Sequence, residues 1–255
     1  MGYRTVWLSD IHLGSRGCRV NLLLDFLHNV QCERLYLVGD IVDLTRLRRS
    51  FYWPPSHTEV LRVILQKSAS GTRVIYIPGN HDDDLRRFCG TRFGHIEIVR
   101  RAVHTTRSGR RLLIVHGDEF DSIIQCSPLL VSVGTAAYGM LLSINRLVHW
   151  TRQRLDRPYW SAARQVKSRM KHAVDYAERF KQACLLAAAE ARVDGIVCGH
   201  IHRAELCTRD GLVYGNDGDW VESCTALVEH ASGELALVAW NEVAAARGLS
   251  LETAA

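Results

Sequence analysis

The sequence predicts an α/β fold in which a mainly parallel sheet is followed by a helical insertion and then by antiparallel strands. Apolar runs alternate with helical patterns in the first third of the chain, and strand signals stop between residues 122 and 192. Near the end, short apolar runs separated by glycine-containing turns return. We therefore expect one domain over residues 1–255 that carries a helical insertion at 122–192.

The first part of the chain has the β-α-β-α-β order that is typical of a parallel sheet. Buried strands are predicted at 5–8, 35–38 and 74–77, and apolar residues at helical spacing predict helices at 20–27 and 60–65. This order implies right-handed crossovers between parallel strands. Two further strands are predicted at 96–99 and 112–115, with a turn at Ser108-Gly109 between them.

The last part of the chain reads as a strand followed by hairpins. The strand is predicted at 195–198, and the later strands at 204–208, 212–214, 225–230 and 235–240. Asp210-Gly211 and Ser232-Gly233 are the turns expected within the hairpins. The alanine-rich tail after Asn241 is expected to be loose.

Composition sets broad limits on the class of protein. Hydrophobic residues make up 47% of the 255, and the formal charge is +5, which favours an anionic partner without specifying it. The eight cysteines contain no Cys-x-x-Cys pair, which excludes a zinc ribbon or a thioredoxin-like site and favours a reducing compartment. The N-terminal residues lack the pattern of a secretory signal, so a cytoplasmic protein is expected.

The stretch from Ser122 to Asn145 has no charged residue and is long enough to span a bilayer. One span would, however, put His116 and His200 on opposite sides of the membrane, where they cannot share a site. A buried or membrane-surface helix is therefore the preferred interpretation.

Five short polar segments each follow a predicted strand. They are Asp10-Ile11-His12, Gly39-Asp40, Gly79-Asn80-His81-Asp82, His116-Gly117-Asp118 and Gly199-His200-Ile201-His202. A single segment of this kind is an ordinary loop, but five in order are rare by chance. Because the carboxyl ends of strands in an α/β sheet converge on one crevice, we expect these segments to meet there.

The side chains in these segments predict a metal site. Its expected ligands are Asp10, His12, Asp40, Asn80, His116, His200 and His202. This mixed oxygen and nitrogen set suits Mn²⁺, Fe or Zn²⁺. Seven ligands exceed what one tetrahedral ion takes, so two divalent ions sharing Asp40 are predicted. Asp10 and His12 alternate, as do His200 and His202, and an extended backbone would point the members of each pair the same way.

From Asp10 to His202, the five segments resemble the calcineurin-like metallophosphoesterase superfamily. The resemblance implies a four-layer α/β/β/α metallophosphoesterase sandwich, with residues 122–192 as a helical lid. More closely, the chain is similar to the UDP-2,3-diacylglucosamine pyrophosphohydrolase family of lipid A synthesis. That similarity rests on the region of Asp43, on Phe51-Tyr52-Trp53-Pro54, on Glu119-Phe120-Asp121 and on Asn216-Asp217-Gly218-Asp219-Trp220. The best-known members of that family have Arg where this chain has His81, so a sister branch with a related substrate stays open.

The resemblance also implies a mechanism and catalytic residues. Two divalent ions, with Mn²⁺ the first expectation, would activate water to cleave a pyrophosphate bond and release UMP and an acylated sugar 1-phosphate. Asn80 would help to hold the phosphate oxygens, His81 would protonate the leaving oxygen or stabilise its charge, and Asp82 would orient His81. The alternative for His81 is a buried structural histidine.

The substrate-binding residues are expected mainly in the insertion. Between residues 146 and 181 there are ten lysines or arginines against three acids, next to the apolar stretch 129–144. Arg164, Lys167 and Lys171 have helical spacing, and Asp121 is added by the resemblance. The resemblance favours a site for a lipid phosphate over a solvated charged helix. The expected partners are a lipid-linked nucleotide sugar and the surface of the inner membrane, with no nucleic acid; the oligomeric state stays open.

Two rival functions stay open at the level of sequence. One is a metallophosphodiesterase that acts on nucleic acid or a small nucleotide, since basic charge with aromatic residues is compatible with it. The other is a non-catalytic scaffold with the same fold, against which stands the complete set of expected ligands.

Overall fold

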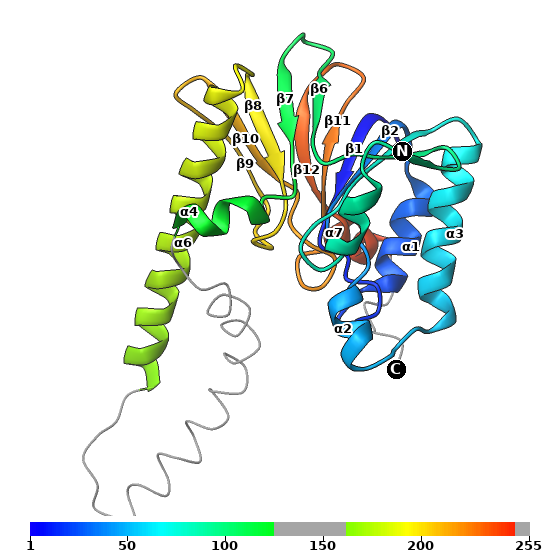
Figure 1. The fold of residues 1–255 in the computed structure, drawn as a ribbon, viewed down its shortest axis with the longest axis horizontal. Helices are drawn as coiled ribbons and strands as arrows, with labels where there is room; N and C mark the ends of the chain where they lie inside the picture. The colour runs from blue at the N-terminus through cyan, green and yellow to red at the C-terminus, as the bar shows by residue number, and fades with distance from the viewer. Residues whose placement is uncertain (125–161, 248–255) are drawn as a thin grey trace, which may run out of the picture. The chain divides into compact units, whose positions relative to one another are not determined.

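The computed structural model describes residues 1–124 and 162–247, with side chains described outside 123–173 (Figure 1). The chain divides into two compact units. The first consists of Met1–Glu119 and Cys184–Ala255, and the second of Phe120–Ala183.

The larger sheet of the first unit has seven strands in the order β12-β11-β1-β2-β3-β5-β4. Their bounds are β1 Gly2–Leu8, β2 Gln31–Val38, β3 Arg73–Ile77, β4 Arg92–Phe93, β5 Ile96–Ile98, β11 Thr225–Glu229 and β12 Leu235–Ala239. β1, β2, β3 and β5 are parallel, as predicted, whereas β11 joins the sheet antiparallel to β1. The parallel register brings the carboxyl ends of β1, β2 and β3 to one edge, with Val38 opposite Ile77.

The smaller sheet has five strands in the order β6-β7-β8-β10-β9. Their bounds are β6 Ala102–Thr105, β7 Arg111–Ile114, β8 Gly195–Cys198, β9 Glu205–Arg209 and β10 Leu212–Asn216. The three central strands are parallel and the two edge strands are antiparallel to their neighbours. Strands that are far apart in the sequence, such as β7 and β8, are therefore neighbours, and their carboxyl ends also meet at one edge.

Helices α1 Val20–Asn29, α3 Pro55–Ala69 and α7 Trp240–Ala246 pack on the outer face of the larger sheet. The short helix α2 Leu44–Arg49 and the 3₁₀ helix η1 Asp83–Phe88 follow β2 and β3 and contain no buried residue. The apolar side chains of α1 recur at helical spacing, so that Leu23, Phe26 and Leu27 are buried on one face. α3 begins with Pro55, whose fixed φ suits the first turn of a helix.

Two hydrophobic cores hold these layers together. One contains Phe26 and Val63 and lies between the helices and the larger sheet. The other lies between the two sheets and contains Trp7, Tyr36 and Ile114. Trp7 stacks on Tyr36 with ring centroids 5.8 Å apart, in the offset range that favours aromatic pairs. The result is a mixed α/β fold with two packed sheets and helices, as the sequence predicts.

The second unit contains α4 Asp121–Ile124 and most of α6 Ala162–Glu190. The Tyr176 hydroxyl donates a hydrogen bond to Asp121 Oδ1 (2.6 Å), and Phe120 contacts Phe180 edge to face. The last turns of α6 belong to the first unit, where Cys184 and Ala188 are fully buried. The expected helical lid at 122–192 falls largely outside the described residues and stays a prediction, as does the placement of the apolar stretch Ser122 to Asn145.

One expectation about the elements is wrong, and three elements were not predicted. The tail after Asn241, expected to be loose, begins inside α7, because Trp240 and Ala244 are buried against the larger sheet and its helices. The sequence also gave no signal for the strands β4 and β6 or for the short helix α2. β4 has only two residues and both are exposed, so no apolar alternation marks it. Within the described residues, no helix has the length and apolarity that crossing a membrane requires.

Candidate metal centre

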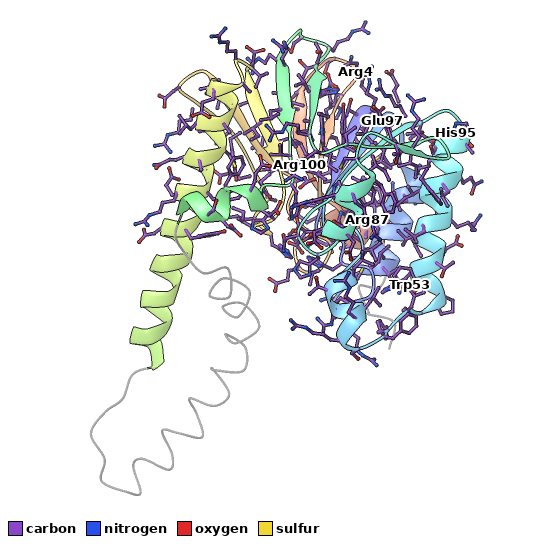
Figure 2. All side chains as sticks on the ribbon, in the orientation of Figure 1. Arg4, Trp53, Arg87, His95, Glu97 and Arg100 are labelled. Atoms are coloured by element: carbon purple, nitrogen blue, oxygen red, sulfur yellow. The ribbon has the colours of Figure 1, made fainter. Side chains whose placement is uncertain are left out.

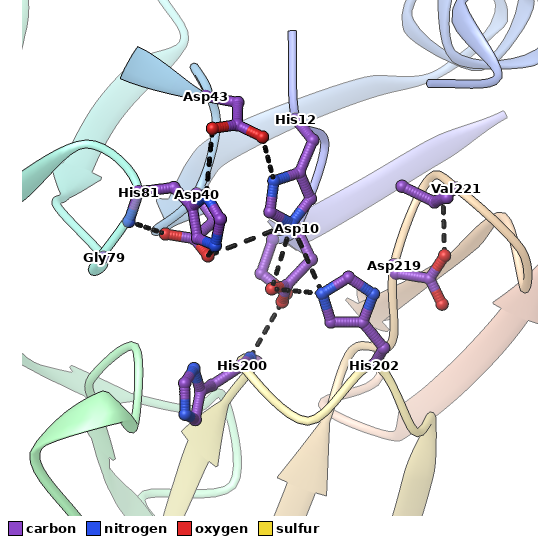
Figure 3. A network of polar contacts seen from close by, with 12 residues as sticks. Asp10, His12, Asp40, Asp43, Gly79, His81, His200, His202, Asp219 and Val221 are labelled. Atoms are coloured by element: carbon purple, nitrogen blue, oxygen red, sulfur yellow. Dashed lines mark hydrogen bonds and ion pairs between the residues drawn. The ribbon is translucent and has the colours of Figure 1, made fainter. Parts of the chain in front are cut away.

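The predicted ligands converge where strands of the two sheets end. Asp10 and His12 follow β1, Asp40 follows β2, and His200 and His202 follow β8 (Figure 3). Asn80 follows β3 and His116 follows β7. Residues that are 190 positions apart are thereby in contact, as with the backbone N–H of His200, which donates to Asp10 Oδ2 at 2.8 Å.

The first group of side chains consists of Asp10, His12 and His202. Their ligand atoms all lie within 4.8 Å of one another. His202 Nε2 is 3.1 Å from Asp10 Oδ1 and 3.3 Å from His12 Nε2. Asp10 Oδ1 is buried and accepts no well-aligned hydrogen bond. Two imidazole nitrogens that face each other beside a buried carboxylate oxygen form a donor set suited to a divalent cation.

The second group is built around Asp40, His116 and Asn80. His116 Nε2 lies 3.5 Å from Asp40 Oδ2 and 3.2 Å from Asn80 Oδ1. Its other nitrogen, Nδ1, donates to the Val38 carbonyl at 2.8 Å, which orients the ring so that Nε2 faces the two oxygens. The ring of His200 lies beside His116, with centroids 5.2 Å apart.

Asp40 lies between the two groups. Its Oδ1 accepts a hydrogen bond from the backbone N–H of His81 at 2.8 Å, which fixes the carboxylate. Its Oδ2 is 3.5 Å from His116 Nε2 and 3.9 Å from His12 Nε2, one histidine from each group. This position fits the bridging role predicted for Asp40, and the residues present fit two divalent ions.

Five of the predicted ligands have left-handed backbones. The φ angles of Asp10, His12, Asp40, His200 and His202 lie between 51° and 70°. Non-glycine residues adopt this region only at a cost of about 1–2 kcal/mol, and they concentrate at functional sites. The expectation that an extended backbone would align the pairs is therefore wrong: β1 ends at Leu8 and β8 at Cys198, and turns beyond them orient the side chains.

The electrostatics of the cluster favour charged carboxylates beside protonated or ligated imidazoles. Burial acts to raise the pKa of Asp10, but His202, His116 and His12 lower it well below the usual range. Burial alone lowers the pKa of His202, yet the Asp10 carboxylate raises it to about 9. A cation bound there would displace the imidazole protons, since a histidine ligand binds a metal through a nitrogen lone pair.

His81 is half-buried at the edge of the cluster, and its partner is Asp43 rather than the expected Asp82. His81 Nδ1 lies 2.9 Å from Asp43 Oδ1, and this hydrogen bond, helped by the charge of Asp40, raises the pKa of His81. The other Asp43 oxygen is 3.5 Å from His12 Nδ1. Sequence reasoning missed Asp43 as a site residue, although its place three residues after Asp40 was a usable signal.

Asp82 instead positions the backbone of the Asp40 loop. It is fully buried and accepts hydrogen bonds from the backbone N–H groups of Gly79 (2.6 Å) and Ile41 (2.9 Å), and from the Tyr76 hydroxyl. These bonds join the loop after β3 to the loop after β2. Asp82 is therefore a positioning residue for Asp40.

Sequence reasoning also missed Ser9 and Asp217, which position Asp10 through hydrogen bonds. The Ser9 hydroxyl lies 2.5 Å from Asp10 Oδ2 and 2.6 Å from Asp217 Oδ1. One hydroxyl proton serves only one carboxylate, so the second contact requires a proton on Asp217. Burial raises the pKa of Asp217 well above its ordinary value, in agreement with that requirement. A protonated Asp217 donates to Ser9, which donates to Asp10.

The predicted substrate-binding residues all lie in the second unit, and their role stays a prediction. Asp121 lies in the second unit, where it accepts the hydrogen bond from Tyr176. Arg164, Lys167 and Lys171 lie in α6, and their side chains are outside the described part of the chain.

Fold and site together define a two-sheet α/β protein with an Asp/His/Asn cluster suited to two divalent cations. The model of the calcineurin-like phosphoesterase family matches residues 3–204, and this chain belongs to that family. The family binds divalent metals, and its members include metal-dependent phosphoester hydrolases. No curated protein matches the chain.

Solved structures of low sequence identity resemble the chain over most of its length. They include a Vps29 single mutant from Entamoeba histolytica (12% identity, 92% of this chain and 96% of that chain, TM-score 0.44). They also include a novel archaeal phosphodiesterase (12% identity, 92% of this chain and 98% of that chain, TM-score 0.44). A third is YfcE, a phosphoesterase from E. coli (14% identity, 93% of this chain and 99% of that chain, TM-score 0.43).

Proposed function

We propose that this protein is a divalent-metal-dependent hydrolase that cleaves the pyrophosphate bond of UDP-2,3-diacylglucosamine, or of a related lipid-linked substrate. The products would be UMP and 2,3-diacylglucosamine 1-phosphate. The observation that carries the hydrolase assignment is the convergence of seven ligand-bearing residues from five loops, with Asp40 between two groups of ligands. The substrate rests on the sequence features shared with the lipid enzyme family.

Divalent cations in this cluster would supply a bound water of lowered pKa and charge stabilisation for the phosphoryl oxygens. Asn80 is exposed beside His116, so its amide can also contact a phosphate oxygen. His81 is bonded to Asp43 through Nδ1, and its Nε2 faces the cluster at 4.0 Å from Asp40 Oδ2. Its raised pKa favours the protonated ring, so Nε2–H can donate a proton to the leaving oxygen.

A product assay tests the proposal. Purified protein with Mn²⁺ should release UMP from UDP-2,3-diacylglucosamine, and Asp40→Ala should abolish turnover because it removes the carboxylate between the two ligand groups. Replacing His81 with Gln should lower kcat by about 10²–10⁴-fold, the usual contribution of a general acid. Unchanged turnover in Asp40→Ala would contradict the bridging role.

The same assay distinguishes the two rival functions. Release of nucleotides from single-stranded DNA, with no UMP from the lipid substrate, would identify a phosphodiesterase of another class. A protein that binds Mn²⁺ but hydrolyses neither substrate, nor a generic aryl phosphodiester, would be a scaffold.

We further propose that the basic segment of α6 binds the lipid substrate and that the protein associates peripherally with the inner membrane. Reversing the charge at Arg164 and Lys167 should then weaken turnover of the lipid substrate more than turnover of a small aryl phosphoester. It should also reduce sedimentation of the protein with anionic vesicles. Equal losses of turnover on both substrates would show that this segment does not recognise the lipid substrate.

A further inference from the structure

A cavity of about 460 Å³ lies away from the metal centre, near the amino ends of the parallel strands. Arg34 in β2, Arg73 in β3 and residues of β6 line it. Arg34 precedes Asp40 by six residues along an extended strand, which corresponds to about 20 Å. Figure 2 labels two of the lining residues, Arg4 and Glu97. The cavity is therefore separate from the predicted metal ligands.

The lining is strongly basic. Four arginines and one acid belong to it, namely Arg4, Arg34, Arg73, Arg101 and Glu97. Arg4 is paired with the buried Glu229 at 2.7 Å, and Arg73 with Glu97 at 3.1 Å. Arg101 lies 3.9 Å from Glu119, so three acids are paired with three of the four arginines and one positive charge, that of Arg34, remains in excess.

Arg34 is the arginine without a partner. Its Nη1 is buried and has no hydrogen-bond acceptor in the part of the chain that the structure describes, and no ion pair to it is found there. A buried donor on a charged group is costly to leave unsatisfied. An anion in the cavity would supply both the missing acceptor and the missing negative charge.

The size and chemistry of the cavity indicate the class of anion. Its volume lies in the range of about 300–1,000 Å³ that is typical of small-molecule sites. The planar guanidinium fork matches the oxygens of a phosphate group better than a single point charge does. The phenol of Tyr36 also lines the cavity and adds a hydroxyl donor and an aromatic face.

We propose that this cavity is a second binding site, which takes a small molecule that carries a dianionic phosphate group, with Arg34 as the principal contact. The site is independent of the proposed hydrolase activity. Its ligand is either free phosphate or a small phosphomonoester, and both present the same terminal group to the arginines.

Calorimetric titration of the metal-free protein tests this site. Inorganic phosphate and AMP are the probes, and the variants are Arg34→Gln and Arg62→Gln. Arg62 is a matched control: the same charge is lost from α3, where Arg62 is exposed and paired with Glu59. We expect Arg34→Gln to weaken binding at least tenfold and Arg62→Gln to leave the Kd within twofold. Tighter binding of AMP than of phosphate would identify a phosphomonoester as the ligand class.

Thermal unfolding separates a binding role from a structural one. Phosphate should raise the melting temperature of the wild type and of Arg62→Gln but not that of Arg34→Gln. In phosphate-free buffer, Arg34→Gln should melt no lower than the wild type, because it removes an unpaired cation. Absence of phosphate and AMP binding in the wild type, or undiminished binding in Arg34→Gln, would overturn the proposal.

Discussion

Individual residues of the metal centre are held by partners whose roles can be separated by substitution. Asp43 contacts His81 through one carboxylate oxygen and His12 through the other. It also caps α2 by accepting a hydrogen bond from the backbone N–H of Arg46 at 2.8 Å. One side chain therefore supports the local helix, a predicted ligand and the candidate general acid.

We expect Asp43→Asn to lower kcat by about 10–100-fold, the usual effect of removing a partner of a metal ligand. Asn still caps a helix, so the fold should be kept and the loss should come from the missing charge beside His12 and His81. Kinetics and a thermal melt check this. Asp210→Asn is the control, since Asp210 is an exposed turn residue with positive φ. A wild-type rate in Asp43→Asn would count against its positioning role.

A second prediction concerns Gly39, which comes directly before Asp40. Its φ is +85°, and a Cβ there would collide with the ring of His116. Gly39→Ala should therefore displace His116 and remove most of the metal affinity, measured by Mn²⁺ titration. Gly109→Ala is the matched control, because its φ is +87° and its Cβ would meet no neighbour within 4 Å. Equal effects of the two substitutions would show that backbone strain alone is responsible.

At the scale of elements, a buried polar network joins β1, β6 and β11. The side chain of Glu229 accepts hydrogen bonds from Arg4 Nη1 (2.7 Å), Thr5 Oγ1 (2.9 Å) and the backbone N–H of Arg107 (2.6 Å). His104 Nε2 lies 3.0 Å from the same carboxylate. Strands of the two sheets are thus connected through one carboxylate, in addition to their hydrophobic core.

This network predicts a loss of stability on acidification. Burial lowers the pKa of His104 in the folded protein, despite its hydrogen bond to Glu229. The unfolded chain then binds a proton more readily than the folded one as the pH falls below about 6.5, so the free energy of unfolding decreases. His104→Gln should flatten this decrease between pH 7.5 and 5.5, measured by urea denaturation. His28→Gln, an exposed substitution on α1, should keep the wild-type slope.

At the scale of the whole molecule, the metal centre joins loops from both sheets, so bound cations should stabilise the fold. Mn²⁺ at 100 times its Kd contributes about 2.7 kcal/mol if it binds only the folded state. For a protein of this size, a stabilisation of that order corresponds to a rise in melting temperature of roughly 5–10 °C. Chelation should reverse the rise, and Asp10→Asn should show little of it. A melting temperature that does not depend on Mn²⁺ would contradict the metal site.

Much of this organisation could be predicted from local sequence signals. Apolar runs such as Val74–Ile77 marked the buried strands, and the polar segments after them marked the predicted ligands, because strand ends of an α/β sheet are where such side chains collect. Asp43 was noted only as part of the family resemblance and not as a site residue, since its two contacts, to His12 and His81, follow no periodic pattern.

The sequence by itself determined the class of fold, most of the strands along the chain and the ligand-bearing segments, because these depend on local periodicity and residue chemistry. Only the tertiary structure decided that β11 joins β1 while β10 joins β8, since pairing depends on contacts between distant residues. The tertiary structure also decided that Asp10 and His200 have left-handed backbones. It likewise decided that the guanidinium of Arg34 has no partner among the described residues. The free-energy cost of these features is offset by the packing of the surrounding residues, which no local sequence pattern reveals.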